Sequence, residues 1–267
     1  MEKAIYLFCL ACSGEVPPLE GAGISGSERL FQEDFRDVTA VVCTVPLDEF
    51  VGSSADQRLQ ELAWVGPRAL RHEQVIEEVM QYSPVLPARF GTLFSSRESL
   101  QGLLENNHSQ IGQFLVHMRD KQEWAVKCVL SRATAKQRLL SEKLSKLQED
   151  LDSTPPGMRY FKERQVMAEV DKALSRWLTE VSKAVAEELK VFSVDSKKRG
   201  VVQAPEDNSM EMVANWAFLV GRSVVQNFKT MVDKANRGHN DQGLFFRCSG
   251  PWPPYTFSPP LDTEPRS

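Results

Sequence analysis

The chain has no long apolar run, no surplus of positive charge and few histidines. No stretch approaches the roughly 18 apolar residues of a membrane span, so we expect no integral membrane segment. Its 32 Lys and Arg against 36 Asp and Glu give a net charge of −4, which offers no attraction for nucleic acid or an anionic membrane. The 4 histidines stand apart from one another. We therefore expect neither nucleic acid nor membrane as a partner, and no metal.

The 5 cysteines do not follow a redox or metal-binding pattern. Cys9 and Cys12 form a lone C-x-x-C, but redox motifs of this type lie where a strand leads into a helix, and here a Gly-Glu-Val-Pro-Pro loop follows. A zinc site would need a second closely spaced pair. The remaining cysteines occur singly, at Cys43, Cys128 and Cys248. We expect all of them to be small structural side chains.

Residues 21–26 match G-x-G-x-x-G, the pattern of a dinucleotide-binding loop. That loop works only where the glycines directly follow a strand and open a helix whose N-terminus receives the pyrophosphate. Here the preceding strand ends near residue 12, and only a short segment, 28–35, separates Gly26 from the next strand. We interpret the motif as a flexible glycine-rich loop and expect no cofactor.

The amino end imitates a short secretory signal, because Lys3 is followed by apolar residues 4–12. A secretory signal has at least about 15 residues and a basic head, whereas Glu2 cancels the charge of Lys3. We interpret the segment as a first strand. The protein is then expected in the cytoplasm, with reduced cysteines and an unused glycosylation sequon at Asn107-His108-Ser109.

The first 120 residues are predicted to form an α+β domain. We expect strands at 3–11, 38–45 and 85–94, and helices at about 56–65, from Pro67 onward, and from about 97 to 118. Ser95 or Ser96 is the expected N-cap of the last helix. His72 shares a helix face with Val75, Ile76 and Val79, which favours a packing role over a metal ligand.

A polar hinge at 120–122 separates a second domain, 121–267. Its predicted elements are strands at 123–130, 191–196, 212–220 and 244–249, with helices at 158–190 and 223–236. Trp124, Val126, Cys128 and Leu130 share one strand face. This βαββαβ order is that of a ferredoxin-like fold. A helical extension of about 132–190 is inserted, with a coiled-coil seam at Leu140, Leu144, Leu147 and Leu151.

Arg89 stands in the middle of an apolar run, where burying an unpaired guanidinium would cost several kcal/mol. We expect it to pair with a carboxylate, from Asp37, Asp48 or Glu123, or else to reach solvent from a strand edge. Arg89 is thus a candidate structural anchor or interface residue, together with its neighbours Phe90 and Gly91.

A proline-rich tail, residues 250–267, carries Trp252, Tyr255 and Phe257. These rings hold too much apolar surface to remain in water, and proline lowers the entropy cost of ordering the segment. We expect the tail to dock on the body of the protein and to join the two domains. The alternative is a free arm that waits for a partner.

Three blocks in fixed order carry a resemblance: PVLPARFGTLFSS at 84–96, EWAVKCVL at 123–130 and GPWPPYTF at 250–257. With DVTAVVCTVPLDEF at 37–50 and RHEQVIEEV at 71–79, the chain resembles the gas vesicle protein GvpF/GvpL family from about residue 3 to 257. The resemblance implies two α+β domains, the first a modified ferredoxin-like unit. It also implies an accessory protein of gas vesicle formation.

No Ser-His-Asp, Cys-His, paired-carboxylate or metal-ligand constellation has credible spacing, so no catalytic residue is expected. The hypothesis is a non-catalytic protein that binds the apolar gas vesicle shell subunit and other accessory proteins, as the resemblance implies. The alternative is a small-ligand enzyme built from paired ferredoxin-like domains, which a cavity with convergent polar groups would favour. The candidate interface or anchor residues are Arg89, Phe90, Gly91, Glu123, Trp252, Tyr255 and Phe257.

Overall fold

A computed structural model describes residues 2–141, 156–201 and 210–262. The chain divides into two compact units, Met1–Gln122 with Trp252–Ser267, and Glu123–Pro251. The first boundary lies close to the hinge expected at 120–122. The tail differs from the expected division, because from Trp252 onward it belongs to the N-terminal unit.

The N-terminal unit is built on one sheet with strand order β2-β3-β1-β4, and β5 also pairs with β1. Its elements are β1 (Lys3–Cys12), β2 (Leu30–Phe35), β3 (Val38–Pro46), α1 (Ser53–Arg58), α2 (Leu62–Val79), β4 (Val85–Pro87), β5 (Leu93–Phe94) and α3 (Arg97–Met118). The central strand β1 runs antiparallel to both β3 and β4. This order is that of a ferredoxin-like sheet, modified because a loop connects β1 to β2 where a helix would stand.

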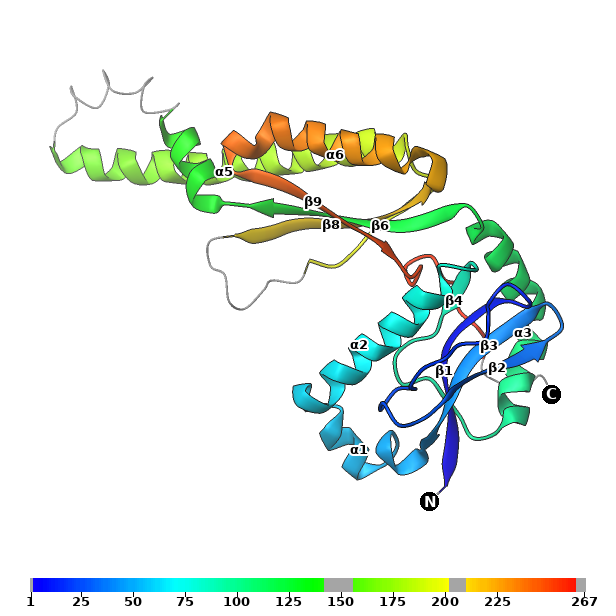
Figure 1. Cartoon of the computed structure of the whole chain (residues 1–267). Helices are drawn as coiled ribbons and strands as arrows, with labels where there is room; N and C mark the ends of the chain where they lie inside the picture. Colours follow the sequence, from blue (N-terminus) through cyan, green and yellow to red (C-terminus); the bar gives the residue numbers. More distant parts are fainter. Residues whose placement is uncertain (1, 142–155, 202–209, 263–267) are drawn as a thin grey trace. The chain divides into compact units, whose positions relative to one another are not determined.

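Helices cover both faces of this sheet (Figure 1). On one face, Val75, Ile76 and Val79 of α2 pack with side chains of β1 and β3. The intervening residues of β1 point to the opposite face, as strand geometry requires. There α3 packs against the sheet through a buried stripe that includes Leu100, Leu103, Leu104, Ile111 and Leu115.

The structure corrects three expectations in this unit. Residues 30–35 form a strand, β2, although three of its six residues are polar; pairing with β3 holds it at the sheet edge. Helix α2 begins at Leu62, so Pro67 lies inside the helix rather than at its start. The expected strand at 85–94 is broken into β4 and β5, because Gly91 adopts a left-handed φ of 82° that a strand does not accommodate.

The C-terminal unit holds a second sheet with strand order β7-β8-β6-β9. Its elements are β6 (Lys121–Leu130), α5 (Pro156–Lys190), β7 (Asp195–Lys198), β8 (Glu211–Gly221), α6 (Val225–His239) and β9 (Leu244–Trp252), and residues 132–141 are also helical. The βαββαβ order and the strand sequence 2-3-1-4 are ferredoxin-like, as predicted. Strand β7 begins at Asp195, four residues later than expected. Leu144, Leu147 and Leu151 of the expected coiled coil lie outside the described residues.

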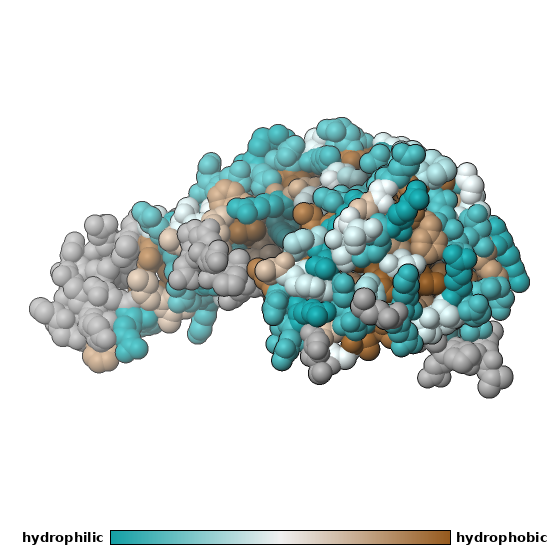
Figure 2. Space-filling model, turned by 60° about the horizontal axis from the view of Figure 1, so that its bottom comes forward, coloured by the Kyte–Doolittle hydropathy of each residue, from teal (hydrophilic) through white to brown (hydrophobic). Residues whose placement is uncertain are grey.

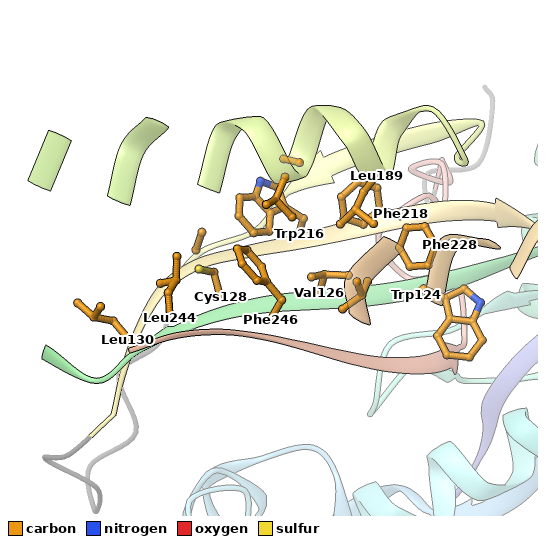
Figure 3. Close-up of a cluster of buried hydrophobic side chains, with 14 of the residues drawn as sticks. Trp124, Val126, Cys128, Leu130, Leu189, Trp216, Phe218, Phe228, Leu244 and Phe246 are labelled. Carbon is orange, nitrogen blue, oxygen red and sulfur yellow. The ribbon is translucent and has the colours of Figure 1, made fainter. Parts of the chain in front are cut away.

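Alternation along β6 builds the core of this unit (Figure 3). Trp124, Val126, Cys128 and Leu130 lie on one face, as predicted, and pack with residues of β8, β9 and the helices. Figure 3 shows Leu189 of α5 and Phe228 of α6 over the same face. From Val170 to Lys190 the exposed residues of α5 are mainly polar, so this part of the helix is amphipathic and its apolar stripe packs on the sheet.

Candidate functional site

The loop between β4 and β5 is held by backbone hydrogen bonds at both ends. Ala88 N donates to Phe8 O over 2.9 Å, and Leu7 N donates to Thr92 O over 3.0 Å. Inside the loop, the Thr92 hydroxyl donates to Arg89 O over 2.7 Å. The loop is therefore an ordered extension of the sheet, and it presents the Arg89 side chain to solvent.

A buried pair of side chains, Tyr6 and His72, is hydrogen-bonded to the backbone of the same loop. The Tyr6 hydroxyl lies 2.9 Å from His72 Nδ1, and His72 Nε2 lies 3.0 Å from Ala88 O. Because a carbonyl oxygen only accepts, Nε2 carries the proton and Nδ1 accepts from Tyr6. Gly91 N in turn donates to the Tyr6 oxygen over 3.2 Å. The network thus reaches the loop on both sides of Arg89.

Burial keeps this pair neutral. Removal from water lowers the pKa of His72 to about 4 and raises the pKa of Tyr6 above its ordinary value. Phe90 packs its ring edge-on against His72 at 5.9 Å between centroids. His72 is 1% exposed, so the expected packing role on the helix face is confirmed. The sequence pattern gave no signal for its bond to Tyr6.

Arg89 itself is exposed, and none of the ion pairs among the described residues includes it. Of the two expected arrangements, the described residues show the second: Arg89 reaches solvent, and none of the three candidate carboxylates forms an ion pair with it. Two of the candidate carboxylates have other partners. Asp37 Oδ1 lies 2.5 Å from His108 Nε2, and Glu123 forms an ion pair with Arg199 in the C-terminal unit. The physical reason is the break of the strand at Gly91, which places the guanidinium in solvent, where it needs no partner.

The tail is hydrogen-bonded to two helices of the N-terminal unit, α2 and α3. The Tyr255 hydroxyl donates to Glu73 Oε1 of α2 over 2.8 Å, and burial raises the pKa values of both groups. Further along, Asp262 N donates to Asn107 Oδ1 of α3 over 2.8 Å, and Asn107 Nδ2 returns a bond to Asp262 O over 2.9 Å. Asn107, the asparagine of the glycosylation sequon, is thus buried and holds the tail against α3 by two hydrogen bonds.

The other tail aromatics are less enclosed. Trp252 is 41% exposed, and Phe257 is half-buried. Pro253 and Pro254 are buried, and the Pro254 carbonyl accepts bonds from the backbone N–H groups of Phe257 and Ser258. The tail therefore begins with a compact turn and then extends to α3.

A groove of about 700 Å³ lies between the β4–β5 loop and the tail. Its walls combine strand, loop, helix and tail residues: Leu7, Leu10, Leu86, Pro87, Ala88, Arg89, Thr92, Phe94, Leu103, Tyr255, Thr256, Ser258, Pro259, Pro260 and Leu261. Arg89 is the one ionised side chain in this lining. We call this feature the Arg89 groove.

The residues that line the Arg89 groove include no histidine, cysteine, aspartate or glutamate. Besides Arg89, the titratable residue in the lining is Tyr255. Burial raises the pKa of its hydroxyl group, which therefore stays protonated. No cluster of three or more His, Cys, Asp or Glu side chains suited to a metal occurs in the described parts of the chain. The polar side chains of the lining are Arg89 and the hydroxyl groups of Thr92, Tyr255, Thr256 and Ser258.

The glycine-rich loop at 21–26 uses its own backbone donors internally. Ser25 N donates to Glu28 Oε2 over 3.0 Å, and Gly23 N donates to Glu28 O. Arg71 donates twice to Ala22 O and ties the loop to α2. The Ser25 N–H therefore donates to a carboxylate of the chain itself. All 5 cysteines are free, and burial raises the pKa of Cys12.

The surface outside the groove is mixed. On the face drawn in Figure 2, hydrophilic side chains surround separate apolar patches. The exposed apolar residues are spread over several elements, with Leu62, Leu70, Tyr82 and Val116 among them. Scattered residues of this kind are normal on protein surfaces. No helix of the described segments has the length and hydrophobicity needed to cross a membrane.

Comparison with known proteins places these features in a family. A family model described as gas vesicle synthesis protein GvpL/GvpF matches residues 4–259. Gas vesicle protein L of Streptomyces sp. (strain CB03234) is 27% identical over 264 residues, covering 95% of this chain and 91% of that protein. Gas vesicle protein F of the same strain is 24% identical over 190 residues, covering 70% of this chain and 76% of that protein.

Two solved structures share the fold. The crystal structure of GvpF from Anabaena sp. PCC7120 has a TM-score of 0.67, with 18% identity, and covers 97% of this chain and 98% of that one. GvpF from Microcystis aeruginosa has a TM-score of 0.66 with 17% identity, covering 96% and 99%. The predicted resemblance is confirmed. The chain belongs to the gas vesicle synthesis protein GvpL/GvpF family and has an accessory role in gas vesicle formation.

Proposed function

We propose that this protein binds the apolar shell subunit of the gas vesicle during nucleation or growth, and contacts other accessory proteins, without catalysing a reaction. The observation that carries the proposal is the Arg89 groove. It is an open, largely apolar surface whose backbone is held in place by the β-sheet and the Tyr6–His72 pair. Such a surface suits the recognition of an apolar partner.

The chemistry of the partner favours an early protein contact. A small, highly apolar subunit that is left exposed in water would aggregate before it could be added to a shell. A protein that covers part of its apolar surface would keep it available for assembly. The lining of the groove supports binding rather than catalysis, because it holds a cation and hydroxyl groups but no acid–base pair.

We infer a cytoplasmic protein that associates with gas vesicles. Five free cysteines fit a reducing compartment. The net charge of −4 disfavours nucleic acid or an anionic membrane as the partner.

A genetic experiment tests the proposal. A strain that lacks this chain is complemented with Pro260→Asp, which places a charge on the exposed rim of the groove, or with Leu62→Asp, an exposed control on α2 outside it. We expect few vesicles with Pro260→Asp and normal vesicles with Leu62→Asp, counted by electron microscopy at equal protein levels. Normal vesicles with both variants would contradict a role for this surface.

A further inference from the structure

We propose that the Arg89 groove binds an apolar segment of a partner protein that carries one carboxylate, and that this carboxylate pairs with Arg89. The inference rests on the proposed function in its choice of a gas vesicle protein as partner. The chemistry of the segment follows from the groove alone.

The groove is complementary in charge to a carboxylate. Among the lining residues of the groove, Arg89 alone is ionised, and the rest are apolar side chains, hydroxyl groups and prolines. An arginine cannot be neutralised at physiological pH, and its planar donor fork matches a carboxylate in two-point geometry. When an apolar occupant displaces water from the groove, Arg89 loses hydration. An occupant that brings a carboxylate compensates for this loss, and one without it does not.

The backbone around Arg89 is ordered by hydrogen bonds within the protein. The carbonyl of Arg89 accepts from Thr92, and the flanking residues Ala88 and Gly91 are bonded to His72 and Tyr6. The backbone that carries the guanidinium is therefore set before a ligand arrives. Fixing this backbone in advance lowers the entropy cost of binding. Tyr6 and His72 thus order this loop. Arg89, its charged residue, takes part in none of the ion pairs among the described residues.

The lining of the groove favours a protein segment over a phosphate-bearing ligand. Its volume of about 700 Å³ gives room for several side chains. Phosphate sites gather several cations or backbone N–H donors, whereas this lining has one cation beside Leu86, Phe94 and Leu261. In a short run of apolar residues with a single Asp or Glu, the apolar side chains can pack against the apolar lining and the carboxylate can pair with Arg89.

Site-specific photo-crosslinking in vesicle-forming cells tests the inference. A benzophenone amino acid replaces Pro260 at the groove rim or, as a control, Leu62, which is 82% exposed and lies outside the groove. We expect a crosslink from position 260 to an apolar segment that contains Asp or Glu, identified by mass spectrometry, and no such product from position 62. Arg89→Gln should lower the yield about tenfold, as expected for the loss of a charged hydrogen bond. Arg29→Gln, at an exposed arginine elsewhere in the same unit, should leave it unchanged.

A peptide probe gives a measurement that does not depend on the shell subunit. A capped peptide of leucine and valine with one glutamate is compared with the same peptide carrying glutamine, by fluorescence anisotropy on the full chain. We expect about tenfold tighter binding of the glutamate peptide, and loss of that difference in the Arg89→Gln variant. Circular dichroism confirms that the variant is folded.

The outcomes separate this inference from the proposed function. A crosslinked segment of the expected chemistry in another gas vesicle protein would support the groove and overturn the shell subunit as its partner. A segment without a carboxylate, a crosslink to a second copy of this chain, no crosslink from position 260, or equal affinity for the two peptides would overturn the inference.

Discussion

The buried Tyr6–His72 pair shows how single residues prepare a surface for binding. Neither side chain touches solvent appreciably, yet together they hold the backbone on both sides of Arg89. The sequence pattern placed His72 on the inner face of α2 but could not reveal a partner 66 positions away. Sequence spacing predicts which face a side chain occupies, while long-range contacts depend on how the strands pair.

The neutral state of His72 makes stability depend on pH. Burial lowers its pKa from 6.5 to about 4, so the unfolded chain takes up a proton before the folded one does. The favourable contribution is complete above pH 6.5 and is lost as the pH falls from 6.5 toward 4. We expect the free energy of unfolding to drop by about 2 kcal/mol between pH 7 and 5 from this group.

Denaturant unfolding at several pH values measures this effect. The decrease should be smaller in His72→Gln and unchanged in His117→Gln, an exposed histidine at the end of α3. An equal pH dependence in all three proteins would show that His72 does not titrate as a buried neutral group.

Two glycines provide a matched test of backbone conformation. Gly91 has a φ of 82°, and no atom lies within 4 Å of an added Cβ; Gly102 in α3 also has open space, with a helical backbone. We expect Gly91→Ala to destabilise by about 1 kcal/mol through strain, and Gly102→Ala to stabilise by about 0.5–1 kcal/mol. Chemical unfolding of both variants measures the two signs. Stabilisation by Gly91→Ala would mean that the loop relaxes freely.

At the scale of elements, helices and strands with a regular apolar pattern were predictable from the sequence, whereas interruptions of a strand were not. The alternation of β6 and the apolar stripe of α5 predicted both elements close to their observed bounds, because one buried face imposes a clear period. Ser96 caps α3 as one of the two serines expected, and its side chain accepts from Ser99 N. β2 was missed because half of its residues are polar, which an edge strand tolerates; the strand pairs with β3 and buries Leu30 in the core.

The Arg89 segment illustrates a different limit. Its apolar residues matched a strand, but the left-handed Gly91 and the bonds to Tyr6 interrupt pairing after Pro87. An arginine inside an apolar run is chemically unusual, because its charge needs either a partner or solvent. The sequence did not predict the direction of the side chain, because a carboxylate partner and solvent both satisfy a guanidinium.

The tail is expected to stabilise the N-terminal unit. Removal of residues 253–267 eliminates the Tyr255–Glu73 bond and both bonds between Asn107 and Asp262. We expect the melting temperature to fall by about 4–8 °C, which corresponds to roughly 2 kcal/mol for a protein of this size. Differential scanning calorimetry measures the change.

Truncation after Asp262 is the matched control, because it keeps all three of these bonds. It should leave the melting temperature nearly unchanged. If removal of residues 253–267 also leaves it unchanged, the tail contributes no stability and is available as a partner-binding arm.

At the scale of the whole molecule, the two units repeat one strand order. The sheets β2-β3-β1-β4 and β7-β8-β6-β9 place corresponding strands in the same positions. We propose that residues 123–251 form an autonomous domain, since they hold a core of their own. The isolated segment should show one cooperative melt and a spectrum of mixed helix and strand. A chain without a thermal transition would contradict this division.

Direct association with the shell subunit tests the central claim. The tagged protein is purified from cells that produce the gas vesicle proteins, in the presence of a metal chelator and without added nucleotide, and the retained shell subunit is quantified by mass spectrometry. We predict retention by the wild type and by Arg29→Glu, and about tenfold less with Arg89→Glu, where the charge is reversed in the groove. Absence of the shell subunit from the purified wild type, together with normal vesicles in cells that lack this protein, would contradict the account.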